Sequence, residues 1–354
     1  MSPFRTHNIY ENNTRGFTSQ RVYYAIPTSS SSSSGSAGVN YNETEYGYDV
    51  MGRASRVQTP RGTVMRLVYH PRGWVLGEWV GTDDAGATDA DPTGGGTTGN
   101  NMVQISGFAY DSGSAGLDGN LTTLTQYQDS TSGNNRVTTY NYDFRKRKIN
   151  ETGEINVYIA YTYDNLDRVT IVQNYDTNAS GHLIGKSARN YDNLGRVYQS
   201  IRYAVNPSTG AVGNSLTDNV WYDPLRRVAM TLSAGSSLVQ KLDYDRIGRL
   251  ATQYSSTLPS SSSSSSIAYP YPISVSSDTV FQQVENTYDD ASNLIQVITR
   301  QRMHNASGAG ALGTPTTSPT GRVYYQASWQ DPLGRIIYAG NYGTNAASSL
   351  YPCC

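Results

Sequence analysis

The sequence predicts an all-β fold made of tandem β-hairpins. The first observation is a six-residue pattern, Tyr-Asp-x-x-Gly-Arg, that recurs along most of the 354 residues. The second is the composition, in which hydrophobic residues make up 37% and charged residues 16%, while tyrosine outnumbers phenylalanine 29 to 5. The third is the presence of short strand-like runs beside the pattern, such as residues 66–69 and 74–80. Many short strands and polar turns fit this composition, whereas a helical enzyme core does not.

The pattern is intact in three places and is recognisable in six more. The intact copies contain Tyr48, Asp49, Gly52 and Arg53, then Tyr191, Asp192, Gly195 and Arg196, then Tyr244, Asp245, Gly248 and Arg249. The degenerate copies contain Tyr142, Asp143, Tyr163, Asp164, Arg168, Tyr222, Asp223, Tyr288 and Asp289, and one that begins at Gln330 contains Asp331, Gly334 and Arg335. A ninth copy begins at Tyr69 and has His70 for the aspartate and Trp74 for the arginine.

We interpret each copy as the turn of a β-hairpin. The aspartate can accept hydrogen bonds from backbone N–H groups just after it, and the glycine supplies the left-handed residue that closes the loop. Tyrosine then ends one strand and arginine begins the next. Four copies hold Lys146, Asp167, Arg226 and Ser292 in the glycine position. Those turns must either accept left-handed strain or use another loop type. The recurring Asp–Arg pair is interpreted as turn chemistry.

The pattern resembles the Rhs or YD-repeat family, which includes bacterial Rhs proteins, shell components of insecticidal toxin complexes and animal teneurins. The resemblance covers roughly residues 41–340. It implies that successive hairpins form an elongated, curved or spiralling antiparallel sheet, which in the family can close into a hollow cocoon. Family cocoons use many more repeats, and the self-cleaving core of Rhs toxins has a second Asp-Pro-x-Gly element that is absent here. The resemblance therefore implies an architecture and leaves the activity open.

Three parts are expected along the chain: residues 1–40, a repeat body over 41–340 and a tail over 341–354. Residues 21–26 have strand composition and precede a Ser/Gly-rich tether, an arrangement that favours strand exchange between molecules. Insertions are expected at 81–101, 255–272 and 307–320. The first carries four aspartates and is interpreted as a solvated loop rather than a Ca²⁺ site, because its spacing matches no defined loop. The others are expected to be surface loops that carry glycans or contact a neighbouring subunit.

Several residues are candidates for covalent modification. The Asn-x-Ser/Thr sequons are at Asn12, Asn42, Asn120, Asn150, Asn178 and Asn305, and serine-rich runs begin near Ser29 and Ser260. About six sequons are expected by chance in a chain so rich in Asn, Ser and Thr, so their number proves nothing. The adjacent Cys353 and Cys354 would form a strained bridge with each other. An intermolecular disulfide or truncation of the sequence there fits them better than a metal site.

The sequence holds no recognisable catalytic pattern. Its four histidines show none of the spacings of zinc sites, and neither a Gly-x-Ser-x-Gly elbow nor a phosphate-binding loop with Lys-Ser/Thr is present. Adjacent carboxylates such as Asp289 and Asp290 point to opposite faces of an extended chain, which does not suit glycoside hydrolysis. We therefore expect no enzyme activity, no metal and no cofactor.

Charge and hydropathy narrow the function classes further. A net charge of −1 gives no electrostatic reason to expect that the chain binds nucleic acid. The sequence has no run of 18 apolar residues, so it predicts no transmembrane helix. The start lacks the apolar stretch of a signal peptide, so export is signalled elsewhere or the chain is a processed or internal piece. We expect an extracellular or cell-surface structural glycoprotein that assembles with itself into a filament or surface layer by strand exchange or edge pairing. The alternatives are a carbohydrate-binding adhesin and a fragment of a toxin-encapsulating shell.

Overall fold

The computed structural model describes residues 7–13, 16–25, 35–111, 118–129, 132–153, 157–259 and 274–344. Over these residues the chain forms β-strands joined by turns and loops, and its one helical element there is a 3₁₀ turn, Ser132–Asn134. The predicted all-β array of tandem hairpins is therefore confirmed. Within the same ranges, no helix is long and apolar enough to cross a membrane.

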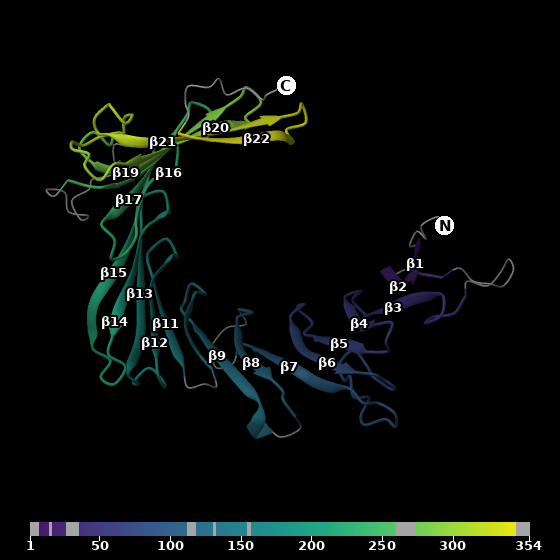
Figure 1. The fold of residues 1–354 in the computed structure, drawn as a ribbon. Helices are drawn as coiled ribbons and strands as arrows, with labels where there is room; N and C mark the ends of the chain where they lie inside the picture. Colours follow the sequence, from purple (N-terminus) through teal and green to yellow (C-terminus); the bar gives the residue numbers. More distant parts are fainter. Residues whose placement is uncertain are drawn as a thin grey trace. The chain divides into compact units, whose positions relative to one another are not determined.

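The hairpins belong to two compact units (Figure 1), one with residues 1–162 and 174–182 and the other with 163–173 and 183–354. The strands of the first unit are β1 (His7–Asn13), β2 (Gly16–Tyr23), β3 (Tyr41–Tyr48), β4 (Ala54–Gln58), β5 (Val64–Tyr69), β6 (Val75–Gly81), β7 (Val103–Tyr110), β8 (Leu121–Gln126), β9 (Arg136–Tyr142) and β10 (Lys148–Thr152). Residues of both units occur in β11 (Tyr158–Tyr163) and β12 (Val169–Tyr175). The strands of the second unit are β13 (Leu183–Tyr191), β14 (Val197–Val205), β15 (Val212–Tyr222), β16 (Val228–Leu232), β17 (Leu238–Tyr244), β18 (Leu250–Thr257), β19 (Thr279–Tyr288), β20 (Leu294–Arg302), β21 (Gly321–Gln330) and β22 (Ile336–Gly343).

Strands pair with their chain neighbours in antiparallel order within each unit. The pairing runs from β1 to β11 in the first and from β13 to β22 in the second. From β13 onward, the register shifts at the turn of each hairpin that carries the repeated motif: Asn190 pairs with Gln199, whereas Tyr191 pairs with Val197. Such a shift is a β-bulge, which increases the local twist of the pair.

The structure differs from the expectation of a detachable N-terminal strand. Arg21 lies in β2, where it pairs with Ile9 of β1 on one side and Glu43 of β3 on the other. Its guanidinium also forms ion pairs with Glu11 at 2.9 Å and Glu43 at 2.7 Å. The strand at residues 16–23 is therefore internal, and the expected boundary at residue 40 does not separate it from the repeat body. The serine run that was expected to act as a tether lies outside the described residues.

The first insertion is also more closely packed than a solvated loop. Asp84 forms ion pairs with Arg56 at 2.7 Å and Arg66 at 2.6 Å, two residues of neighbouring strands β4 and β5. The hydrogen bond from Arg56 is the main cause that holds the pKa of the Asp84 carboxyl below its usual range. Pro92 is fully buried. In the described part of the chain, no group of three or more His, Cys, Asp or Glu could hold a metal ion.

Two clusters of buried hydrophobic residues lie in the second unit, and we call them together the covered region. One cluster contains Trp221, Met230, Leu232 and Val239, and a second contains Val275, Val280 and Leu312. Leu312 comes from the third insertion, which was expected to be a surface loop, and its side chain is 4% exposed. The reason is that the insertion is anchored to the sheet: the N–H of Leu312 donates to Gln283 Oε1 at 2.8 Å. Two other expected boundaries move, because residues 255–257 belong to β18 and 341–343 to β22.

Candidate functional site

The repeated turns form the most regular site in the molecule. Oδ1 of Asp192 accepts hydrogen bonds from the N–H groups of Leu194 and Arg196, both at 2.9 Å, and Oδ2 accepts from Arg196 Nε at 2.7 Å. The Asp192 N–H donates to the Arg196 carbonyl, which closes the loop. The same three side-chain bonds are made by Asp49, Asp143, Asp164, Asp245 and Asp331. One carboxylate therefore organises the whole turn, as expected of an aspartate at this position.

The glycine position is left-handed whether or not glycine fills it. Gly195 has a φ of 82°, and the four substitutes have φ values of 62–70°. These substitutes are Lys146, Asp167, Arg226 and Ser292. Of the two alternatives open for these turns, the chain therefore accepts left-handed strain, and each costs about 1–2 kcal/mol relative to a relaxed L-residue.

Several of the turn carboxyls have lowered pKa values. At Asp192, burial alone would raise the pKa, but hydrogen bonds from the backbone and guanidinium of Arg196 and from the Leu194 N–H outweigh it, so the pKa lies below its ordinary value. At Asp331 the pKa is lowered chiefly by the Arg335 N–H. These carboxylates are held in their charged form by donors that the turn itself supplies.

A second set of contacts joins each hairpin to the next. The Arg196 guanidinium lies 4.2 Å from the centre of the Tyr222 ring, in the following hairpin. The hydroxyl of Tyr222 donates back to the carbonyl of Val197 at 2.9 Å. The tyrosine is thus held by a cation over its ring and a hydrogen bond at its tip, both from the preceding hairpin. We call this series of contacts the Arg–Tyr ladder.

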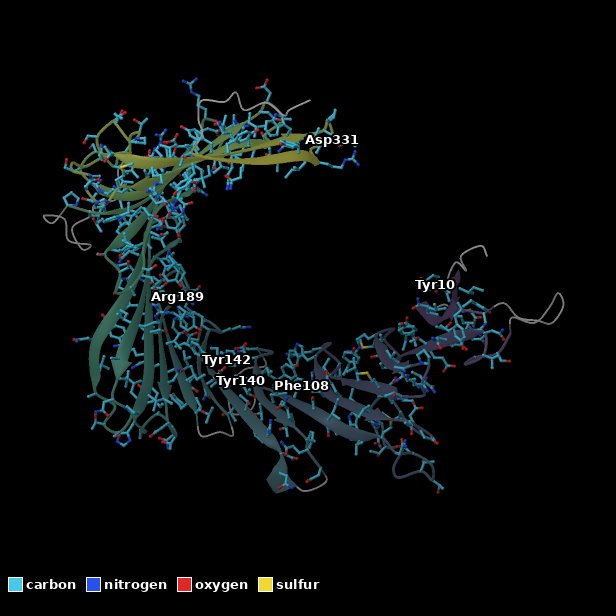
Figure 2. The ribbon with its side chains drawn as sticks, viewed as in Figure 1. Tyr10, Phe108, Tyr140, Tyr142, Arg189 and Asp331 are labelled. Carbon is cyan, nitrogen blue, oxygen red and sulfur yellow. The ribbon has the colours of Figure 1, made fainter. Side chains whose placement is uncertain are left out.

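The ladder repeats along both units. Its further steps join Arg53 to Tyr69, Arg168 to Tyr191, Arg227 to Tyr244 and Arg249 to Tyr288, and each of these tyrosines also donates to a backbone carbonyl of the hairpin before it. Tyr142 on β9, labelled in Figure 2, donates in the same way to Leu121 at 2.8 Å. Reasoning from the sequence assigned the arginine to turn chemistry alone and missed this contact. The available signal was the recurrence of tyrosine and arginine five residues apart within successive copies, although the spacing from one arginine to the next ladder tyrosine varies.

One step has lost both partners together. Asn293 stands where the ladder arginine should be, and Gln330 stands where the next tyrosine should be. The Asn293 amide still donates to Asp289 at 2.9 Å, and Gln330 Nε2 donates to the Leu294 carbonyl at 3.0 Å. The amides therefore keep the hydrogen bonds of the ladder while omitting the cation and the ring.

The copy that begins at Tyr69 uses different chemistry for the same shape. His70 Nδ1 accepts from the Arg72 N–H at 3.1 Å, and the His70 ring stacks on Trp74 with centroids 4.9 Å apart. Trp74 in turn stacks on Tyr110 of the next hairpin at 5.1 Å. An aromatic pair replaces the Asp–Arg pair, and an aromatic stack replaces the cation over the ring.

Tyr110 begins a further turn that the sequence analysis missed. The Asp111 carboxylate accepts from the N–H groups of Gly119 at 2.9 Å and Asn120 at 3.1 Å. Residues 112–118 separate the two halves of the motif, which hid it from a search for a fixed six-residue pattern. The signal that remained was the Tyr-Asp dipeptide at the end of one strand and glycine just before the next.

The candidate modification sites lie in different settings. Asn178 and Asn305 are exposed in loops, and Asn12 and Asn42 are exposed on strands β1 and β3. Asn120 and Asn150 are half-buried, and the Asn150 amide oxygen accepts from Asn141 at 2.7 Å. The remaining candidates, Ser29, Ser260, Cys353 and Cys354, lie outside the described residues.

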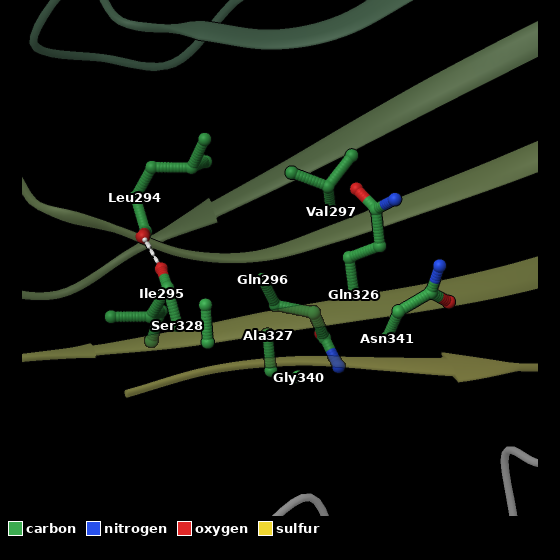
Figure 3. A pocket seen from close by; sticks show the side chains of 10 residues that line it. Leu294, Ile295, Gln296, Val297, Gln326, Ala327, Ser328, Gly340 and Asn341 are labelled. Atoms are coloured by element: carbon green, nitrogen blue, oxygen red, sulfur yellow. Dashed lines mark hydrogen bonds between the residues drawn. The ribbon is translucent and has the colours of Figure 1, made fainter. Parts of the chain in front are cut away.

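The surface has two further features. A groove of ≈ 350 Å³ over β20 to β22 is lined by ten residues, none of which has an ionisable side chain. Figure 3 shows Gln296, Gln326 and Asn341 among them, together with the bond from the Ser328 hydroxyl to the Leu294 carbonyl. The hairpin tips of the second unit form the other feature, with apolar side chains 57–78% exposed at Leu166, Leu194, Leu225, Ile247 and Leu333.

Comparisons with known proteins give only distant structural neighbours. No family model matches the sequence, and no curated protein matches it. Crystal structures of TcdB2-TccC3-Cdc42 and TcdB2-TccC3 are both 12% identical, with TM-scores of 0.38 and 0.37, and the matches cover 96% and 93% of this chain and 20% of each of those chains. A Photorhabdus luminescens Tc holotoxin pore is 11% identical with a TM-score of 0.38, over 96% of this chain and 19% of that one. The chain thus spans about a fifth of the length of these neighbours.

Proposed function

We propose that the chain is a non-enzymatic structural subunit, outside the cell or at its surface, that joins copies of itself through the outer edge of β22. The observation that supports this is an exposed end of the ladder. The Arg335 side chain is 74% exposed, whereas that of Arg196, which carries the next tyrosine, is 14% exposed. Ile336 and Ile337 of β22 are 66% and 69% exposed. Exposed large apolar side chains on one edge strand, with an exposed cation just before it, favour a further hairpin as the partner of that strand.

The strand β1 of a second copy has the polarity that this edge needs. Within each unit, the odd-numbered strands after the first lead into a hairpin turn and pair antiparallel with the even-numbered strand before them, as β21 does with β20. β1 likewise leads into the turn toward β2, and within the described ranges β2 is its one strand partner. Pairing β22 of one copy with β1 of the next continues the antiparallel order. A head-to-tail contact of this kind propagates as a polymer unless it closes.

The contacts of the repeated Tyr, Asp and Arg side chains support a structural role over sugar binding or catalysis. Sugar-binding platforms need an open ring face, but the guanidinium of Arg196 covers the ring of Tyr222, and the other ladder arginines do the same. The carboxylates of the turns are engaged with arginine and backbone N–H groups, which does not suit an acid or base in catalysis. The repeated Tyr, Asp and Arg residues therefore join hairpins rather than present themselves to a ligand.

The test is the assembly state of the purified full-length chain, measured by sedimentation velocity and negative-stain microscopy. Ile337→Lys is expected to raise the concentration needed for assembly at least about tenfold, which corresponds to about 1.4 kcal/mol. Ile184→Lys is the matched control, because Ile184 is an isoleucine 41% exposed on a different strand, β13.

Two outcomes would overturn the proposal. The first is a full-length chain that stays monomeric at high concentration. The second is assembly that survives Ile337→Lys but is lost in Ile247→Lys, which would show that the apolar hairpin tips carry the contact between copies.

A further inference from the structure

A lysine and an aspartate are buried together in the covered region of the second unit, apart from the turns. Nζ of Lys241 on β17 lies 2.6 Å from Oδ2 of Asp278, and their side chains are 0% and 1% exposed. Ser256 on β18, also fully buried, donates from its hydroxyl to the same Oδ2 at 2.9 Å. Lys241 Nζ donates in addition to the carbonyl of Ser274 at 2.9 Å.

This site is a poor environment for two full charges. Val239 and Val280, two positions away from Lys241 and Asp278 along their segments, are both 0% exposed. Among the described residues, Oδ1 of Asp278 is buried and accepts no hydrogen bond. A buried ion pair needs every lone pair satisfied to offset the loss of hydration. The site instead provides donors to one carboxylate oxygen and apolar packing around the pair.

We propose that Lys241 and Asp278 join in an intramolecular isopeptide bond. Within the pair, the ammonium passes one proton to the carboxylate, which leaves a neutral amine and a carboxylic acid. Nζ then attacks Cγ of Asp278, so the Nζ–Cγ bond forms and the Cγ–Oδ2 bond breaks. Oδ2 departs as water with the proton that it received and a second proton from the nitrogen. The products are one amide and one water molecule, with no oxidant, reductant or cofactor.

The neighbouring groups fit both this reaction and its product. The hydroxyl of Ser256 donates to Oδ2, the oxygen that leaves, and so stabilises the negative charge that develops there. The carbonyl of Ser274 holds the attacking nitrogen in place. After the reaction, the remaining N–H still donates to Ser274. Oδ1 becomes the carbonyl oxygen of a neutral amide, which is less costly to bury than a carboxylate.

The bond would tie β17 to the segment just before β19. It would enclose hairpin β17–β18 and the loop that follows it in a covalent ring. A cross-link of this kind restricts the unfolded chain as a disulfide does, and no thiol reagent opens it. The inference is independent of whether copies of the chain assemble.

The test is peptide mapping and intact mass of the full-length native protein after removal of any glycans. The expected result is a chain lighter than its sequence by one water, with a branched peptide that joins Lys241 to Asp278 and no tryptic cleavage after Lys241. Lys241→Ala and Asp278→Ala should have their full sequence masses. Lys186→Ala is the control lysine on β13 and should keep the cross-link.

Two further variants keep the reacting groups in place. Ser256→Ala should slow formation of the bond in newly synthesised chain about a hundredfold, as followed by the loss of one water in intact mass over time, because the donor to the leaving oxygen is lost. Asp278→Asn should give the same branched peptide, with loss of ammonia instead of water. A native chain that unfolds cooperatively, has its full sequence mass and is cut after Lys241 would overturn the proposal, even if the alanine variants do not fold.

Discussion

The turns and the covered region around Lys241 both pair an acid with a base, but the two pairs are made in opposite ways. Asp192 and Arg196 are four residues apart, and each side chain is 14% exposed. Lys241 and Asp278 come from separate strands and loops, and are almost completely buried. The first pair needs only the local turn, so a chain can repeat it many times. The second pair needs three segments to pack together, so it is specified once.

This difference predicts how the two regions respond to change. The turn pairs are partly solvated, so their contribution to stability depends on salt and pH. The buried pair is shielded from both, and the removal of one partner leaves the other without water or counter-charge. Substitutions in the covered region should therefore lower the free energy of unfolding more than matched substitutions on the turns.

The largest effect is expected from Asp278→Ala. The change leaves the Lys241 ammonium buried and uncompensated, which should lower the free energy of unfolding by at least about 3–5 kcal/mol in denaturant titrations. Loss of the proposed cross-link would add to this decrease. The matched turn variant is Asp331→Ala. It removes an aspartate whose partner, Arg335, has a side chain that is 74% exposed. Equal losses in the two variants would contradict the distinction between the regions.

Acidification should weaken the turns together. The pKa values of seven turn carboxyls lie below their ordinary values in the folded chain, at Asp49, Asp143, Asp164, Asp192, Asp245, Asp289 and Asp331. A carboxyl whose pKa is lowered by folding stabilises the fold at any pH above its pKa in the unfolded chain, which is about 3.9. This stabilisation is lost as the pH falls through the pKa of the carboxyl in the folded chain. The denaturant concentration at the midpoint of unfolding should therefore decrease as the pH is lowered below about 4. Asp192→Asn should reduce that dependence, and a midpoint that stays constant in acid would contradict the assignment.

Removal of a tyrosine hydroxyl from the Arg–Tyr ladder should lower the free energy of unfolding moderately. Tyr222→Phe removes the hydrogen bond to the Val197 carbonyl and should lower the free energy of unfolding by about 1 kcal/mol. Tyr198→Phe is the control, because Tyr198 is an exposed tyrosine outside the ladder, and it should change stability by less than about 0.5 kcal/mol. A double-mutant cycle with Arg196→Ala should give a coupling of about 0.5–1 kcal/mol, whereas strict additivity would show that the contact is incidental.

The smallest effect is expected where strain is removed. Arg226 has a φ of 70°, so Arg226→Gly should raise the free energy of unfolding by about 0.5 kcal/mol, the relief of strain being partly offset by greater freedom of the unfolded chain. Gly195→Ala at the equivalent position, with a φ of 82°, should have the opposite sign. A loss of stability in Arg226→Gly would mean that the arginine side chain makes a contact that outweighs its backbone strain.

Much of the candidate site could be predicted, because the interactions that make a turn span only four residues. The Asp192 carboxylate reaches the N–H groups of Leu194 and Arg196 in any chain that bends there, so the motif alone indicates the hairpin. The turn at Tyr110 escaped prediction because an insertion separates its two halves, although the folded chain brings Asp111 and Gly119 together. The hairpin β1–β2 also lacks the motif, and its second strand pairs with β3.

By itself, the sequence determined the all-β class and the positions of most turns, since strand composition and turn chemistry act over short distances along the chain. Tertiary structure alone decided which hairpin each arginine contacts, that Arg21 lies on an internal strand, and that Leu312 of a polar insertion is buried. It also decided that Lys241, Ser256 and Asp278 meet, since their contact depends on the register of β17 and β18 and on the path of the loop before β19. No local pattern encodes that meeting, because burial becomes favourable only when several distant segments pack at once.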